Sequence, residues 1–136
     1  MTKNNPALLI SSRPASVADD FFEFQRSHGI VMWWSRSRIA RSFEMPVLGY
    51  IYQEGRIRYR VKIEEILNDV PEWAKSAVPK EYIARFRSEL KESRSFLKII
   101  GFDRLEHTLS LNDFVTVSGN QLRAAPRRII YVLRKT

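Results

Sequence analysis

Alternation of apolar and polar residues is clearest between Arg56 and Glu64. The apolar positions are Ile57, Tyr59, Val61 and Ile63, and the positions between them are Arg58, Arg60 and Lys62. Successive side chains of a β-strand point to opposite faces, so this alternation predicts a strand with one apolar and one cationic face. We expect the apolar face to pack on a core and the cationic face to meet solvent.

A strand predicted at residues 46–52 precedes this one and is expected to form a hairpin with it. The residues between the two strands are Gln53, Glu54 and Gly55. Glycine adopts positive φ without steric cost, so Gly55 suits the left-handed position of a three-residue loop.

Other runs of β-forming residues predict further strands, at residues 7–11, 30–34, 96–102 and 127–134. Within residues 30–34, alternation places Trp33 and Trp34 on opposite faces of the strand. At most one of these two side chains is therefore expected to lie fully in the core.

Two segments have the apolar spacing of amphipathic helices. In the first, Val17 and Phe21 fall on one face after Ser16, a suitable N-cap residue, and Gly29 follows as a helix stop. The second covers residues 80–92, directly after a proline that suits the first helical position.

Together these elements predict an α+β fold. About five or six mainly antiparallel strands, with two or three helices packed on them, suit a small open β-barrel or curved sheet. A chain of 136 residues is long enough to bury one core. We expect a single domain over residues 1–136, with residues 1–5 as a flexible tail.

Composition argues against metal and thiol chemistry. Cysteine is absent, and the two histidines, His28 and His107, lie in no zinc-binding motif such as HExxH. We expect neither a metal nor a cofactor. The N-terminal residues contain no long apolar segment, and a run of about 18 apolar residues occurs nowhere. We therefore expect a cytoplasmic protein with no membrane association.

Charge indicates the class of partner. The net charge is +8, with a pI near 10.1. No acidic residue follows Asp113, whereas the basic residues beyond it are Arg123, Arg127, Arg128, Arg134 and Lys135. Because a positive field concentrates polyanions, nucleic acid, either RNA or DNA, is the expected partner. The sequence does not indicate an oligomeric state.

Several features share their order with a known superfamily. An SSRP turn follows the first strand, a basic loop follows the tryptophan-containing strand, and RYRVKIEEI ends the strand pair. Over residues 6–134 the chain resembles the PUA-like superfamily and is most similar to its EVE branch, whose relatives include the YTH and ASCH domains. The resemblance implies a pseudo-barrel that binds RNA or DNA, with a pocket in which aromatic side chains hold a flipped, often modified, base.

The segment MWWSRSR supplies the candidate base-binding residues. A base outside a duplex needs an aromatic face to stack on and polar groups for its edge and phosphates. The expected nucleic-acid-binding residues are Trp33, Trp34, Ser35, Arg36, Arg38, Arg41, Arg56, Arg58 and Arg60, with Ser12, Tyr52 and Trp73 as further pocket walls. Two alternatives stay open: the tryptophans serve packing alone, and the cationic strand face is merely solvated.

The expected function is that of a non-enzymatic nucleic-acid-binding domain that recognises a flipped or modified base. One alternative is a small nucleic-acid-processing enzyme of the ASCH-like type, with Asp103, Glu106 and His107 recruited for catalysis. Another is a protein-interaction module whose basic surface meets an acidic partner.

Overall fold

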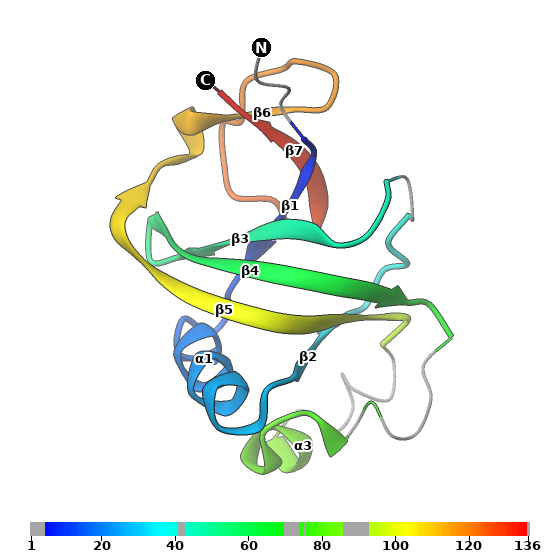
Figure 1. Ribbon diagram of the computed structural model, residues 1–136. Helices are drawn as coiled ribbons and strands as arrows, with labels where there is room; N and C mark the ends of the chain where they lie inside the picture. The colour runs from blue at the N-terminus through cyan, green and yellow to red at the C-terminus, as the bar shows by residue number, and fades with distance from the viewer. Residues whose placement is uncertain (1–4, 41–42, 70–73, 75, 86–92, 136) are drawn as a thin grey trace.

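A computed structural model describes residues 5–40, 43–69, 74, 76–85 and 93–135. It shows a seven-stranded mixed sheet, with the labelled helices gathered toward one end and the two C-terminal strands at the other (Figure 1). In chain order the elements are β1 (Ala7–Ser11), α1 (Ser16–His28), β2 (Val31–Ser35), β3 (Val47–Gln53), β4 (Arg56–Leu67), α3 (Lys80–Arg85), β5 (Ser95–Leu109), the 3-10 turn η1 (Leu111–Asp113), β6 (Phe114–Thr116) and β7 (Ile130–Arg134). The predicted α+β class is confirmed.

The strands follow the order β2-β5-β4-β3-β1-β7-β6. β1 and β3 are parallel, and all other neighbouring pairs are antiparallel, which confirms the mainly antiparallel sheet. The expected five or six strands are too few. The additional strand, β6, has only three residues, so its sequence shows no alternation to recognise.

The hairpin of β3 and β4 forms as predicted, except for its loop. Residues of β4 alternate between buried and exposed positions along the predicted strand. β3 ends at Gln53 and β4 begins at Arg56, so the loop has two residues instead of three. These residues, Glu54 and Gly55, have φ values of 49° and 84°. Positive φ at both central positions defines the type I′ turn, whose twist matches that of the strands.

β1 is buried on both faces, which explains its continuously apolar sequence. Leu8 and Ile10 belong to a main core shared with α1, β2, β4 and β5. Ala7 and Leu9 belong to a second core that includes Phe114 of β6. The end of β1 is therefore held rigidly between two packed layers.

The ends of α1 differ in how well the sequence predicts them. Ser16 is the first residue of the helix and not its N-cap. The hydroxyl of Ser12 instead accepts the Ala18 N–H at 3.0 Å, which satisfies one of the unpaired donors of the first turn. At the other end, Gly29 has φ 82° and donates its N–H to the Gln25 carbonyl at 2.7 Å, as predicted for a glycine stop.

α3 covers the first six residues of the helix expected over 80–92. Residues 86–92, like residues 1–4 of the expected tail, lie outside the described ranges. Tyr82 of α3 packs edge-on against Phe21 of α1, with 5.4 Å between ring centroids. No helix within the described ranges is long and apolar enough to cross a membrane.

The sheet is strongly curved. Three register shifts interrupt the ladder between β4 and the 15-residue β5, and such irregularities bend and twist strands. Residues of β2 and residues adjoining β1 and β7 line one cavity, although three strands separate β2 from β1 in the sheet. Among the described residues, the two end strands β2 and β6 do not pair with each other.

Candidate nucleic-acid interface

A cavity of about 370 Å³ lies where β2 approaches β1 and β7. We call it the tryptophan cavity, and its lining residues are Ser11, Arg13, Trp33, Trp34, Ser35, Arg36, Ser37, Arg127, Arg128 and Ile129. A smaller cavity of about 110 Å³ shares Ser11, Arg13 and both tryptophans, and also touches α1 through Val17 and Phe21. The site therefore combines aromatic and cationic side chains from distant parts of the chain.

The two tryptophans have different environments. Trp33 is only 6% exposed and belongs to the main core, whereas Trp34 is half-buried at the edge of that core. Phe21 of α1 contacts both indoles, with centroid distances of 5.1 Å to Trp33 and 5.5 Å to Trp34. Of these two tryptophans, only Trp33 lies fully in the core, as predicted, and Trp34 stays partly exposed at the cavity.

Four exposed arginines line the tryptophan cavity: Arg13, Arg36, Arg127 and Arg128. They come from the turn between β1 and α1, the residue after β2, and the segment before β7. None of the described lining residues carries a carboxylate. A cavity wall with one sign of charge focuses its field and attracts anions.

Hydrogen bonds fix the segment before β7 against the rest of the cavity. The Ser11 hydroxyl donates to the Pro126 carbonyl at 2.9 Å. The Tyr131 hydroxyl donates to the Ala40 carbonyl at 2.6 Å, and its ring packs on Phe43 at 4.8 Å. Through these contacts the segment carrying the two consecutive arginines is tied both to β1 and to the loop after β2.

A buried polar network positions the loop after β2. The Ser95 hydroxyl donates to the side-chain carbonyl of Asn68 and accepts the Ile39 N–H at 3.0 Å. The Asn68 side-chain amide in turn donates to the Ile39 carbonyl at 3.0 Å. Closer to β2, the Ser35 hydroxyl donates to the Ser37 carbonyl at 2.9 Å. The wall that follows Trp34 is thus held by side chains as well as by the sheet.

The predicted site residues fall into several groups. Trp33, Trp34, Ser35 and Arg36 line the tryptophan cavity together, as a contiguous segment should. Arg38 is exposed nearby but does not line it. Two predicted wall residues have other roles, because Ser12 holds the first turn of α1 and Tyr52 packs on the second core. Arg41 and Trp73 lie outside the described residues.

The arginines of β4 lie apart from the tryptophan cavity and have partners within the protein. Arg56 donates to the Thr108 hydroxyl at 3.0 Å and to its carbonyl at 3.1 Å. Arg58 donates to the Gln53 carbonyl at 3.0 Å, and the Arg60 guanidinium lies 3.9 Å from the Asp103 carboxylate. The most regular cationic pattern in the sequence therefore serves in part to hold its neighbouring strands.

A second cavity of about 360 Å³ lies between α1, the β3–β4 turn and the outer part of β5. Its lining residues are Asp19, Gln53, Glu54, Arg58, Tyr59, Arg104, Leu105 and Thr108. Two carboxylates face two guanidinium groups here, so the charges of the lining cancel. We call it the mixed-charge cavity.

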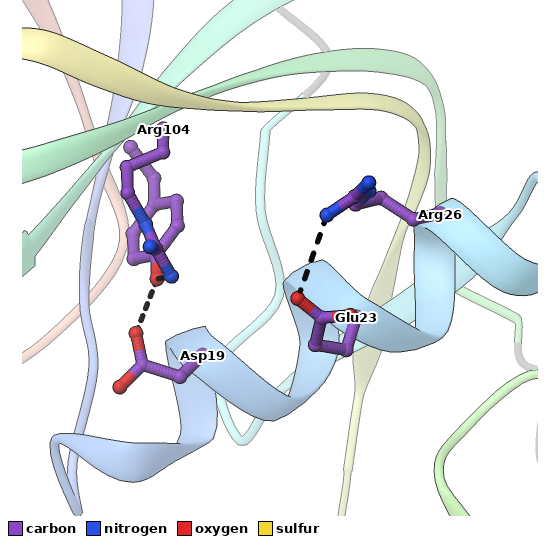
Figure 2. A network of polar contacts seen from close by, with 5 residues as sticks. Asp19, Glu23, Arg26 and Arg104 are labelled. Carbon is purple, nitrogen blue, oxygen red and sulfur yellow. Dashed lines mark hydrogen bonds and ion pairs between the residues drawn. The ribbon is translucent and has the colours of Figure 1, made fainter.

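Tyr59 links the two sides of the mixed-charge cavity. Its hydroxyl donates to the Asp19 carboxylate and accepts a hydrogen bond from Arg104 at 3.1 Å. Figure 2 shows Asp19 and Arg104 close together, with a dashed line running from the Asp19 carboxylate. The Arg104 guanidinium also stacks over Phe22 at 5.1 Å. Burial and the hydrogen bond to Asp19 raise the pKa of the Tyr59 phenol above its ordinary value. This network fastens α1 to β4 and β5.

The residues considered for catalysis do not gather in either cavity. Asp103, Glu106 and His107 are exposed on the outer part of β5 and line neither the tryptophan cavity nor the mixed-charge cavity. His28 stacks on Phe24 at 4.0 Å. Within the described ranges, no three histidine or carboxylate side chains are grouped as metal ligands would be.

Comparison with known proteins identified no relative of the chain. No protein-family model matches the chain, and no curated protein matches it.

Proposed function

We propose that this protein is a non-enzymatic nucleic-acid-binding domain whose tryptophan cavity holds one base outside a duplex. One observation carries the proposal: a half-buried tryptophan and four arginines share a cavity whose described lining has no carboxylate. Trp34 offers the stacking face, and the arginines offer phosphate contacts. RNA and DNA are both candidate ligands.

The energies and dimensions of the site suit this ligand. Stacking of one base on an aromatic side chain contributes about 1–3 kcal/mol. The volume of about 370 Å³ falls within the range of small-ligand sites, at roughly 300–1,000 Å³. Because the faces of a base are covered in a stacked duplex, a base must reach Trp34 from a single strand or after extrusion.

The proposal includes the PUA-like fold, with its EVE-like layout and pseudo-barrel. The curvature of the sheet and the cavity between β2 and the β1–β7 pair support it, since a curved sheet can bring its distant strands together. The SSRP turn supplies Ser11 and Arg13 to the lining of that cavity. A cytoplasmic location is also part of the proposal.

Binding of labelled oligonucleotides tests the function. Single-stranded 12-nucleotide RNA and DNA and their duplexes are titrated at several salt concentrations, with fluorescence anisotropy as the readout. The expected result is binding of single strands that weakens steeply as salt increases, because phosphate contacts release counterions. Absence of binding at low salt contradicts the proposal.

The same titration separates the proposed function from its alternatives. Polyglutamate, added as a competitor, mimics an acidic protein partner. We expect it to displace the strand only at concentrations high enough to act as ordinary salt. Integrity of the strand after incubation reports on an enzyme. Cleavage that is lost in a His107→Ala variant would favour the nucleic-acid-processing alternative.

A further inference from the structure

We infer that Arg13, Arg127 and Arg128 form a binding site for the terminal phosphate of a nucleic-acid strand, a phosphomonoester at its 5′ or 3′ end. This inference rests on the proposed function and specifies the chemistry of the ligand at one side of the tryptophan cavity. We call the three side chains the arginine cluster. All three are exposed and line that cavity.

The pairing of β1 with β7 brings the members of the arginine cluster together. The two strands are antiparallel, so the residues that follow β1 lie beside those that precede β7 (Figure 1). The Ser11 hydroxyl donates to the Pro126 carbonyl at 2.9 Å, which joins the two segments at the cluster. Arg13 lies two residues after Ser11, whereas Arg127 and Arg128 follow Pro126 directly.

Hydrogen bonds on both sides of Arg13 fix its backbone. The preceding residue, Ser12, donates its N–H to the Tyr52 carbonyl at 2.9 Å. The next residue, Pro14, accepts the Val17 N–H at 3.1 Å. Because the backbone is already held, only the side chain of Arg13 must be ordered when an anion binds, and this lowers the entropic cost of binding.

The arginine cluster differs from the arginines of the mixed-charge cavity in its lack of partners. Within the described part of the chain, none of its guanidinium groups forms a hydrogen bond or an ion pair. By contrast, Arg58 donates to the Gln53 carbonyl and Arg104 to the Tyr59 hydroxyl. Arg36 also lines the tryptophan cavity but has a partner within the protein, so it is not a member of the cluster. The positive charges of the cluster therefore lack compensation from the described residues.

A phosphomonoester suits these charges better than a phosphodiester does. Near pH 7 it carries a charge of about −1.5 to −2 and three strong acceptor oxygens. A phosphodiester carries a single negative charge and fewer unesterified oxygens. Guanidinium groups match phosphate oxygens with their planar, paired donors. The arginine cluster can therefore surround a phosphomonoester, and in a nucleic acid this group occurs only at the end of a strand.

Strands that differ at their ends test this preference. A 12-nucleotide single strand, labelled internally, is prepared with hydroxyl groups at both ends, with a 5′-phosphate, or with a 3′-phosphate, in RNA and in DNA. A 14-nucleotide strand with hydroxyl ends is the control, since its two additional phosphodiesters match the charge of one terminal phosphate. By anisotropy at one salt concentration, we expect a phosphorylated strand to bind at least about tenfold tighter than the control. Equal affinities for the control and for both phosphorylated strands overturn the inference.

Glutamine variants locate the preference on the protein. Arg13→Gln and Arg128→Gln should each lower the ratio of the two affinities, phosphorylated strand over control strand, by about threefold or more, because each removes charged donors. Arg123→Gln is the matched control, because Arg123 is exposed in the segment before β7 but does not line the cavity. This variant loses the same charge and should keep the ratio of the wild type. Thermal melting verifies that each variant is folded.

Failure of the inference and failure of the proposed function are distinguishable. If strands with hydroxyl ends bind but a terminal phosphate adds no affinity beyond the charge-matched control, the inference is wrong and the proposed function stands. A ratio that falls in Arg123→Gln as far as it does in the two cluster variants also contradicts the inference. If no strand, with either kind of end, binds the wild-type protein at low salt, the proposed function itself fails.

Discussion

The tryptophan cavity and the mixed-charge cavity are similar in volume but differ in charge balance. The tryptophan cavity has four arginines and no carboxylate in its described lining, whereas the mixed-charge cavity pairs Arg58 and Arg104 with Asp19 and Glu54. In the second cavity the arginines help to hold the fold together. The number of arginines therefore does not identify an anion site. The balance of charge around them is the informative feature.

The largest predicted effects come from alanine variants of the two tryptophans, one of which should mainly lose stability and the other mainly affinity. Trp33→Ala removes a core side chain and should lower the free energy of unfolding by about 3–5 kcal/mol. Trp34→Ala should cost less stability but weaken single-strand binding by about 1–3 kcal/mol, or roughly 5- to 150-fold. Urea unfolding and anisotropy titration measure the two effects. Equal loss of binding in both folded variants would contradict the assignment of Trp34 as the stacking face.

Loss of arginines should reduce the affinity for a single strand in the tryptophan cavity but not in the mixed-charge cavity. The Arg127→Gln and Arg128→Gln double variant should weaken binding by roughly 30-fold, because each lost charged hydrogen bond contributes at least about 1 kcal/mol. The Arg58→Gln variant in the mixed-charge cavity is the comparison and should bind like the wild type. Anisotropy titrations at one fixed salt concentration decide between them. A larger loss with Arg58→Gln would reverse the roles of the cavities.

The Tyr59 hydroxyl should matter for stability and not for binding. Tyr59→Phe keeps the ring against Phe22 but removes the hydrogen bonds to Asp19 and Arg104. We expect a loss of about 1–2 kcal/mol in the free energy of unfolding and an unchanged affinity for single strands. Tyr50→Phe, at another buried tyrosine, is the control. A binding defect in the folded Tyr59→Phe variant would show that the mixed-charge cavity contributes to the ligand site.

The smallest predicted effect is on the pH dependence of stability. The pKa of Tyr59 is raised in the folded protein, so folding favours the protonated phenol. Its contribution is fully present below the unfolded pKa of about 10 and is lost as pH rises through the higher folded value. Between pH 8 and 11 the wild type should therefore lose more stability than Tyr59→Phe. Parallel pH profiles of the two proteins in urea unfolding would contradict this role.

Local patterns allowed most of the strands to be predicted. The alternation in β4 and the glycine of its turn act between neighbouring residues, so the sequence alone identified the hairpin. β6 was missed because three residues are too few for a pattern. Ser12 was expected in a pocket and instead holds the first turn of α1, since its hydroxyl reaches across the turn to Ala18.

The candidate site was predictable only where it is contiguous in sequence. Trp33 to Arg36 occupy one strand end, and their chemistry is visible without a fold. Arg13, Arg127 and Arg128 were not assigned to the site, because their position depends on β1 pairing with β7 and on the curvature that brings both toward β2. The absence of acidic residues after Asp113 was the available signal, but it gave no location.

Removal of three positive charges from either surface distinguishes the tryptophan cavity from the cationic face of β4. Salt-dependent binding of a 12-nucleotide single strand is compared for the wild type, an Arg36, Arg127 and Arg128 triple glutamine variant, and an Arg56, Arg58 and Arg60 triple glutamine variant, all with the same loss of formal charge. We predict that the first triple variant loses both the affinity and most of the salt slope, whereas the second retains both. Loss of binding in the β4 variant, with binding preserved in the cavity variant, would contradict the claim that the tryptophan cavity is the nucleic-acid site.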